Sequence, residues 1–440
     1  MVLIWKRDKN QFKVESYMYI KKIHIQNYKA IKELELEFLP GVNLLIGDNG
    51  VGKTSILEAI SVGIAGMLKG VAGVPVKNIL QNDIHFNIDE SGDASSSLIY
   101  KTPARVACNL QVGVKEYSWE RFRLDEMGNA RTKMEDNGIV KWMQEISNDA
   151  TGLLPILCYQ SDARVWQMRR GDFGKELRKK LNDRRCGYIG CLDYSLDIKG
   201  IQQWCLKMEL NAFQKRKEIQ EYEFFKDIVA GFMQKISDLE KRPEIYYSGQ
   251  IEQMVYREGE IVMPISNLSA GYQSLIWMVM NLAYRLAQLN PDMTLEMENV
   301  SGIVLIDEID MHLHPKWQWN IIKALEETFP KVQFILATHS PIVISSCKNE
   351  RLIMLDNEQE VYYMADAYGY SVQDVLNFRQ GTSEKPKNIK KLSQDFENAM
   401  ENEEFEVAEG IIGQMEKLLG KEHADVRDAR AELVLNRWEE

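Results

Sequence analysis

The chain has 440 residues, of which 45% are hydrophobic and 27% charged, and its formal net charge is −11. This composition is typical of a globular protein with two or three domains, and the acidic balance argues against a surface coated in nucleic acid. No apolar run reaches the roughly 20 residues of a membrane-spanning helix, so a role in transport would need a separate membrane chain.

Six cysteines are scattered without a zinc-like C-x-x-C pair, which predicts buried thiols. The stretch from Met1 to Trp5 is too short for the apolar core of a signal peptide. We therefore expect a reducing, cytoplasmic location.

The first 45 residues lead into a glycine-rich stretch. Residues 1–17 are expected to form an extra polar arm. Residues 19–26 and 31–38 alternate apolar with polar side chains, which is typical of half-exposed antiparallel strands. Residues 42–46 (VNLLI) then predict a short buried strand, and a helix is expected from Ser55 onward.

Between this strand and this helix, residues 47–54 fit the pattern G-x-x-x-x-G-K-[ST], a loop that holds nucleotide phosphates. The glycines let backbone N–H groups converge on the phosphates, and the helix adds the positive end of its dipole. Lys53 is expected to reach the β- and γ-phosphates, and Thr54 to hold Mg²⁺. The candidate nucleotide-binding residues here are Gly47, Asp48, Asn49, Gly50, Val51, Gly52, Lys53, Thr54 and Ser55.

The middle of the chain predicts a small antiparallel sheet over residues 106–119, a helix over 141–146 and an apolar strand over 153–159 that ends at Gln160. Residues 164–185 carry nine Lys or Arg against three acids. This basic stretch is either a solvated helix face or a contact with a phosphate backbone. Residues 201–237 are expected to be largely helical, without a long heptad repeat.

The second half predicts a hairpin over residues 254–265 and a long apolar helix over 270–289. Apolar strands at 303–306 and 332–337 flank a helix from Pro315 to about residue 328, and a hairpin over 352–363 follows. The first of these strands ends in Asp307, expected to hold Mg²⁺, and Glu308, expected to act as general base. The second is followed by His339, which is expected to sense the γ-phosphate.

Residues 267–274 (NLSAGYQS) stand at the start of the long helix. Ser269 is a good N-cap residue, and Gly271 allows close approach of a backbone. A helix N-terminus with a small hydroxyl residue is a potential anion site.

Four segments together resemble the corresponding motifs of ABC-type ATPases. They are residues 47–54, residues 267–274, the strand end at Asp307 and Glu308, and the strand end at His339. Residues 268–271 (LSAG) resemble the family's L-S-G-G signature. The resemblance implies an α/β head with a mixed central sheet, an antiparallel β-subdomain and a helical lobe, and it implies ATP and Mg²⁺ as cofactors. It also implies a head-to-tail homodimer in which Ser269 serves the ATP of the partner.

The runs IDEIDMHLHPKWQ, LSAGYQSL and FILATHSP resemble the overcoming-lysogenization-defect, RecF and SMC-like branch of this family. Within that branch they are similar to PtuA, the ATPase subunit of Septu anti-phage defence systems. The resemblance implies a partner HNH endonuclease (PtuB-like), DNA contacted through the complex, and an assembly larger than a dimer. It also assigns Gln160 to the metal and Lys29 to the nucleotide, where relatives often have Arg.

His312 and His314 have no third ligand, and we interpret them as loop residues rather than a zinc site.

We expect three parts: an arm (1–17), a head (18–370) and an acidic helical tail (371–440). The head comprises a first lobe (18–160), a helical insert (about 161–245) and a signature lobe (246–370). Residues 394–440 carry 14 acids against five Lys or Arg. The tail is either a cap on its own head or an arm for docking and oligomerisation. It is too short for the Toprim nuclease domain of overcoming-lysogenization-defect proteins, and no HNH constellation is seen, so the chain is not expected to be a nuclease.

Three functions fit these features. The leading one is an ATPase subunit that regulates a defence nuclease. The alternatives are a RecF-like DNA-repair ATPase and, less favoured by the IDEIDMHLHP run, the nucleotide-binding subunit of a transporter.

Overall fold

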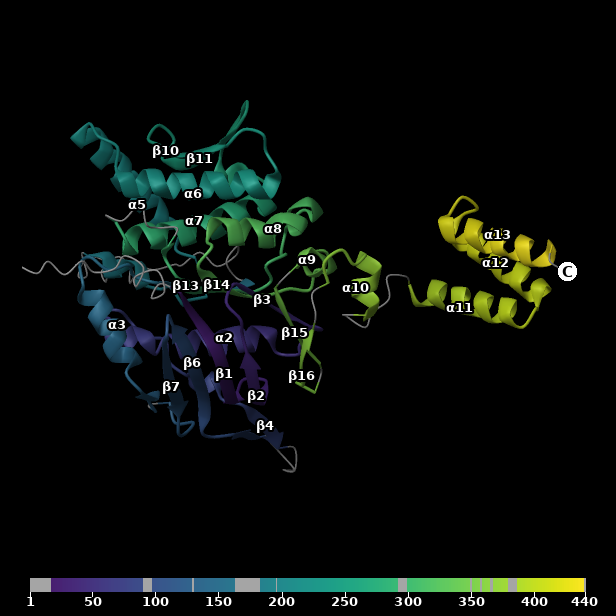
Figure 1. The fold of residues 1–440 in the computed structure, drawn as a ribbon, viewed down its shortest axis with the longest axis horizontal. Helices are drawn as coiled ribbons and strands as arrows, with labels where there is room; N and C mark the ends of the chain where they lie inside the picture. Colours follow the sequence, from purple (N-terminus) through teal and green to yellow (C-terminus); the bar gives the residue numbers. More distant parts are fainter. Residues whose placement is uncertain are drawn as a thin grey trace, which may run out of the picture. The chain divides into compact units, whose positions relative to one another are not determined.

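The computed structural model describes residues 17–89, 97–128, 130–162, 183–194, 196–291, 299–348, 350–356, 358–364, 367–378 and 386–438. The chain divides into two compact units, Met1–Gly369 and Tyr370–Glu440, which we call the head and the tail (Figure 1). Residues 1–16 of the expected arm and residues 164–182 of the basic stretch lie outside the described residues.

A six-stranded sheet forms the centre of the head. Its order is β16-β15-β3-β14-β13-β9, and only β16 runs antiparallel to its neighbour. Every residue of β3, β9, β13 and β14 is buried, which explains their continuous apolar sequences. The strands are β3 (Val42–Ile46), β9 (Ile156–Gln160), β13 (Gly302–Ile306), β14 (Val332–Ala337), β15 (Arg351–Leu355) and β16 (Val361–Met364).

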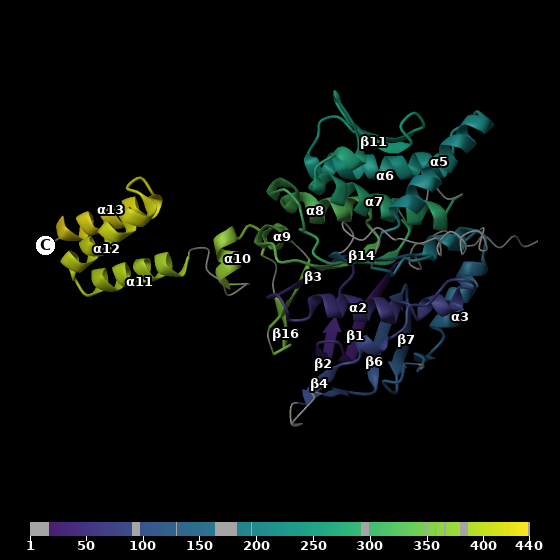
Figure 2. The same ribbon diagram turned by 180° about the vertical axis from the view of Figure 1, so that it is seen from behind.

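Helices cover this sheet on both faces. Helix α2 (Lys53–Ile64) lies on one face, and α7 (Ala270–Leu289) and α8 (Pro315–Thr328) lie on the other (Figures 1 and 2). Both α2 and α7 are almost entirely buried, because each is sandwiched between the central sheet and an outer layer.

The outer layer beyond α2 is a five-stranded antiparallel sheet with the order β2-β1-β6-β7-β8. Its residues alternate between buried and exposed, and the expected strands over residues 19–26 and 31–38 are both present. The strands are β1 (Met18–Tyr28), β2 (Ile31–Glu37), β6 (Ala104–Val112), β7 (Lys115–Arg123) and β8 (Lys133–Asp136). A separate hairpin pairs β4 (Phe86–Asp89) with β5 (Ser97–Tyr100), and α3 (Ile139–Asn148) follows β8.

The helical lobe beyond α7 contains the region, residues 201–237, that was expected to be largely helical. Two helices, α5 (Ile198–Lys215) and α6 (Gln220–Ser237), are separated by a turn in which Arg216 has a φ of 49°. The expected hairpin is part of a three-stranded sheet of β10 (Glu244–Ser248), β11 (Gln253–Glu258) and β12 (Ile261–Pro264). The first of these strands was not anticipated, because residues 244–248 carry little period-two alternation.

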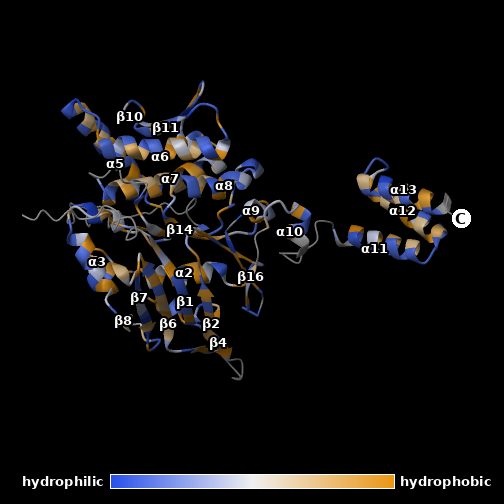
Figure 3. Ribbon diagram, viewed as in Figure 1, coloured by the Kyte–Doolittle hydropathy of each residue, from blue (hydrophilic) through white to orange (hydrophobic). Residues whose placement is uncertain are grey.

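The tail contains α10 (Val372–Phe378) and three longer helices, α11 (Lys387–Glu401), α12 (Phe405–Leu419) and α13 (Ala424–Trp438). Each of the three longer helices carries both hydrophobic and hydrophilic residues (Figure 3). Their apolar faces share one core, whose members include Phe396, Ala408, Ile412, Met415 and Val426. The apolar faces of α11 and α12 therefore pack against each other and against α13.

All six cysteines are buried thiols outside any disulfide, as the sequence predicted. Among the described residues, no helix is long and apolar enough to cross a membrane.

Candidate nucleotide-binding site

Four neighbouring parallel strands bring the expected motifs to one edge of the central sheet. The register pairs Leu45 of β3 with Ala337 of β14, and it pairs Ile306 of β13 with both Leu336 of β14 and Gln160 of β9. Because parallel strands point the same way, their carboxyl ends meet at one edge. The phosphate loop, the expected histidine, the paired carboxylates and the glutamine consequently follow these ends side by side.

The phosphate loop connects β3 to α2 and depends on its glycines. Gly47, Gly50 and Gly52 have φ angles of 143°, 90° and 104°, in the region that side chains disfavour. A Cβ atom on Gly47 would also lie 2.4 Å from the carbonyl oxygen of Leu355 at the end of β15. Both the loop conformation and its packing against the sheet therefore require glycine.

Lys53 lies inside this loop. Its Nζ donates hydrogen bonds of 2.8 Å to the carbonyl oxygens of both Gly47 and Asp48. Burial lowers the pKa of Lys53 to about 8, although Asp307 and Asp48 oppose this effect. Among the other loop residues, Asn49 is exposed and Val51 is buried, while Thr54 and Ser55 lie in the first turn of α2.

Three side-chain oxygens suit a magnesium ion as ligands. They come from the start of α2 and from the ends of β9 and β13. The side chain of Thr54 hydrogen-bonds the Asp307 carboxylate, and burial raises the pKa of this carboxyl to about 6. Gln160 is 1% exposed, its Nε2 donates to the carbonyl of Met278, and its Oε1 is buried without a hydrogen-bond partner in the described part of the chain. Hydroxyl, carboxylate and amide oxygens are the ligands that Mg²⁺ prefers, so these residues fit the ion.

Glu308 follows directly and has an unusual backbone. Its φ is 44°, in the left-handed region, and its N–H donates a 3.1 Å hydrogen bond to Oδ1 of Asp307. Backbone strain of this kind is concentrated at functional sites, where the surrounding structure holds it.

His339 lies close to the phosphate loop. Burial and the neighbouring Lys53 lower the pKa of its imidazole, whereas Asp310 and Asp48 act in the opposite direction. The ring is therefore neutral near pH 7 and able to donate one hydrogen bond.

Two contacts that sequence analysis missed connect the loop of His339 to the loop after Glu308 and to helix α8. Thr338 Oγ1 donates to the Asp310 carboxylate, and Ser340 Oγ lies 2.6 Å from Oε1 of Gln318 in α8. Nε2 of Gln318 also donates to the carbonyl of Leu313 at 2.8 Å. The polar run after β14 was a signal for such contacts, but their partners lie 22 and 28 residues away.

The signature residues stand at the start of α7, on the sheet face opposite α2. Ser269 is the exposed N-cap of this helix, and its hydroxyl does not cap the helix. A Cβ atom on Gly271 would lie 2.6 Å from the carbonyl oxygen of His312. This glycine thus permits close packing of α7 against the loop that follows Glu308.

Lys29 occupies a different environment from the one expected. Its ammonium pairs with Glu58 in α2 and lies 3.7 Å from the Asp83 carboxylate. Lys29 would have to leave this ion-pair cluster to reach a nucleotide.

His312 and His314 lie in the loop before α8, where Nδ1 of His314 accepts a hydrogen bond from the N–H of Lys316. The described residues contain no cluster of three or more potential His, Cys, Asp or Glu metal ligands.

A glycine-rich phosphate loop between a buried strand and a helix, with an acidic strand end beside it, defines a P-loop ATPase. The AAA domain model matches residues 22–245, and an AAA ATPase domain model matches residues 194–344. The chain belongs to this AAA-domain ATPase family.

Individual relatives extend this result. The chain is 26% identical to the "Retron Vc95 probable ATPase" of Vibrio cholerae, over 83% of this chain and 80% of that protein. It is also 26% identical to the "Septu protein PtuA" of Bacillus thuringiensis, over 88% of this chain and 91% of that protein. The SMC head domain from Thermotoga maritima is 18% identical, with a TM-score of 0.42, over 79% of this chain and 99% of that chain. The similarity to PtuA that the motifs indicated is thereby confirmed.

Proposed function

We propose that this chain is the ATP-binding and ATP-hydrolysing subunit of an anti-phage defence complex, and that it regulates a partner HNH endonuclease that cuts DNA. The observation that carries the proposal is the alignment of the phosphate loop, Asp307, Glu308 and His339 along one sheet edge. Similarity to Septu and retron ATPases over most of the chain supports the defence context.

In the proposed reaction, backbone amides of the phosphate loop and the Lys53 ammonium hold the phosphates of ATP. Thr54, Asp307 and Gln160 would hold Mg²⁺, which neutralises phosphate charge when it is bound. Glu308 accepts a proton from the attacking water, an effect worth on the order of 10²–10⁴ in rate. The neutral imidazole of His339 donates a hydrogen bond to the γ-phosphate.

The proposed working unit is a head-to-tail homodimer. The hydroxyl of Ser269 is exposed at the N-terminus of α7 and is not used to cap its own helix. Because α7 and α2 lie on opposite faces of the central sheet, we assign Ser269 to the ATP held by a second copy (Figure 1). The acidic tail would then serve larger assemblies or the nuclease, since a surface of this charge favours protein over DNA.

Three substitutions test this site. Lys53→Ala should abolish ATP binding, because it removes the charge that faces the phosphates. Glu308→Gln should retain binding, stop turnover and trap a closed dimer, and Ser269→Arg should retain binding by single heads but block hydrolysis. Binding is measured by titration calorimetry, turnover by phosphate release and mass by light scattering. Hydrolysis by Glu308→Gln at the parent rate would refute the general base.

The nuclease partner is tested separately. The chain is co-expressed with an HNH protein encoded beside its gene, and DNA nicking is measured with and without ATP. We expect the complex to cut DNA and its cutting to depend on nucleotide, whereas the ATPase alone should not cut. A complex in which Lys53→Ala leaves nicking unchanged at every ATP concentration would contradict regulation by this subunit.

A further inference from the structure

The two residues beside His339 in the chain are held by side-chain hydrogen bonds from other segments. Thr338 is 0% exposed and Ser340 is 6% exposed, whereas the histidine between them is only partly buried. Thr338 Oγ1 donates to the Asp310 carboxylate and accepts a 3.0 Å hydrogen bond from the N–H of Ser340. The backbone that carries the imidazole is therefore fixed through its neighbours.

Ser340 is anchored to two helices. Its hydroxyl donates to Oε1 of Gln318 at 2.6 Å and accepts from the N–H groups of Ile342 and Val343 at 3.1 and 3.2 Å. It thereby caps α9 (Pro341–Ser346), which lies beside α8, the helix that carries Gln318 (Figures 1 and 2). Because a hydroxyl has one proton, the proton of Ser340 is committed to Gln318.

The loop that follows Glu308 is part of the same network. The N–H of Ile309 donates to the carbonyl oxygen of Ala337 at 3.0 Å, and the N–H of Met311 donates to the carbonyl oxygen of Glu308 at 3.0 Å. Asp310, the acceptor of the threonine hydroxyl, lies between these two anchored residues. The expected base and the expected phosphate sensor are thus connected by hydrogen bonds between their neighbours.

We propose that Thr338 and Gln318 are positioning residues that hold the His339 imidazole in place for ATP hydrolysis. This role rests on the proposed function, in which the histidine donates to the γ-phosphate and Glu308 accepts a proton from water. Neither positioning residue is assigned to the nucleotide itself. Their effect on rate arises because a shift of about 1 Å in a catalytic group can cost on the order of 10²-fold.

The γ-phosphate distinguishes this role from general support of the phosphate loop. ADP lacks that phosphate, so its affinity does not depend on where the imidazole lies. A residue that only stabilised the surrounding loops would affect ADP and ATP alike. Loss of positioning should instead lower turnover and leave ADP affinity unchanged.

The test replaces single polar side chains with apolar ones of similar shape. Thr338→Val and Gln318→Met should each lower kcat about tenfold, while KM for ATP and the affinity for ADP change by less than about twofold. Thr338→Ser keeps the hydroxyl and should turn over near the parent rate. Phosphate release gives kcat and KM, and calorimetry gives ADP affinity.

Each possible result decides the role of a residue. Turnover at the parent rate in Thr338→Val or in Gln318→Met would remove that residue from the assignment. A loss of ADP affinity as large as the loss of turnover would show a structural role only. A parent chain that does not hydrolyse ATP would instead overturn the proposed function, and the positioning role would fall with it.

A double substitution asks whether Thr338 acts through the histidine. His339→Ala should lower kcat, and adding Thr338→Val to it should cost less than about a further twofold, because the group that was positioned is gone. Additive losses would overturn the positioning role. His339→Ala at the parent rate would refute the histidine as sensor, and the positioning role with it.

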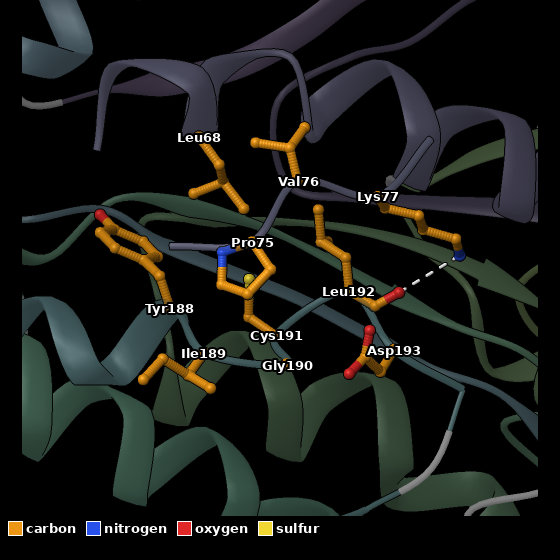
Figure 4. A pocket seen from close by; sticks show the side chains of 10 residues that line it. All are labelled: Leu68, Pro75, Val76, Lys77, Tyr188, Ile189, Gly190, Cys191, Leu192 and Asp193. Carbon is orange, nitrogen blue, oxygen red and sulfur yellow. Dashed lines mark hydrogen bonds between the residues drawn. The ribbon is translucent and has the colours of Figure 1, made fainter. Parts of the chain in front are cut away.

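Two controls exclude trivial effects of the substitutions. Thr328, the last residue of α8, has a buried hydroxyl without a hydrogen-bond partner in the described part of the chain, so Thr328→Val should leave kcat unchanged. Leu68 lines a cavity of about 220 Å³ whose walls are formed by residues outside this network (Figure 4). Leu68→Ala should lower the melting temperature by enlarging this cavity, with kcat within about twofold of the parent. A loss of kcat in Leu68→Ala as large as in Thr338→Val would attribute both losses to stability and overturn the positioning role.

Discussion

Burial, rather than ion pairing, determines the pKa values of two lysines, one at the start of α2 and one in the segment that follows it. The pKa values of Lys53 and Lys77 are both lowered to about 8, and burial is the larger cause in each case. For Lys53 this places a readily neutralised ammonium where phosphates are expected. For Lys77 it has a consequence for stability.

We predict that Lys77 makes the stability of the head rise with pH in the alkaline range. Its folded-state pKa of about 8 lies below the ordinary value of 10.5. Below pH 8 both states carry the proton, and the full cost of a buried charge is present. Between pH 8 and 10.5 the folded state releases the proton first, so stability rises with pH.

The measurement compares the parent with Lys77→Met by thermal unfolding at pH 7.5 and pH 10. The parent should gain on the order of 1–3 kcal/mol relative to the variant across this interval. Parallel pH dependence of the two proteins would mean that the ammonium carries no such burial cost.

At the scale of single residues, the sequence predicts the roles of only those residues that lie within one short motif. The residues from Gly47 to Ser55, and Asp307 with Glu308, belong to patterns that carry their own chemistry. The pairing of Lys29 with Glu58, by contrast, joins residues 29 positions apart. No local pattern encodes such a contact, because it depends on how β1 packs against α2.

At the scale of elements, the start of α7 depends on one glycine. We predict that Gly271→Ala pushes this helix away from the loop before α8, since the new Cβ would meet the His312 carbonyl at 2.6 Å. Stability should fall by about 1–3 kcal/mol. ATP binding should persist while hydrolysis falls, because Ser269 shifts with the helix.

The matched control is Gly410→Ala in α12, where an added Cβ meets nothing within 4 Å. That change should be neutral or stabilise the tail by up to about 1 kcal/mol, because alanine favours helix. An unchanged melting temperature and turnover in Gly271→Ala would show that the loop before α8 moves aside without loss of stability.

Elements with strong periodicity or continuous apolar runs were predictable, whereas short exposed ones were not. The four buried strands β3, β9, β13 and β14 and helix α7 lie where the sequence indicated. The hairpin of β4 and β5 was missed, since Ile88 and Leu98 remain 59% and 50% exposed and show no buried face. The position of the break between α5 and α6 could not be predicted, because the break contains neither glycine nor proline.

At the scale of the whole molecule, the tail has a hydrophobic core of its own. The apolar stripes of α11 and α12 therefore need no external cover. Hydrophobic side chains remain exposed on the tail at Val407, Leu418, Val434 and Leu435. These, together with the acidic charge, are the features that a protein partner would contact.

We predict that a chain ending at Gly369 keeps ATP binding, because every motif of the site precedes residue 342. It should lose assembly beyond the dimer, retention of the nuclease, or both. Light scattering and pull-down measure these properties, with ATPase activity as the folding control. A truncated protein that retains its mass and its partner would assign the tail no docking role.

The burial of all six cysteines makes this chain well suited to site-specific labelling. Burial raises the pKa values of the Cys108 and Cys191 thiols to about 12, so they react slowly with maleimides at neutral pH. A single cysteine introduced at exposed Asn49, and another at Ser269, would then be the reactive thiols of an otherwise native protein. Crosslinking or energy transfer between such positions in separate copies would follow the approach of two heads in real time.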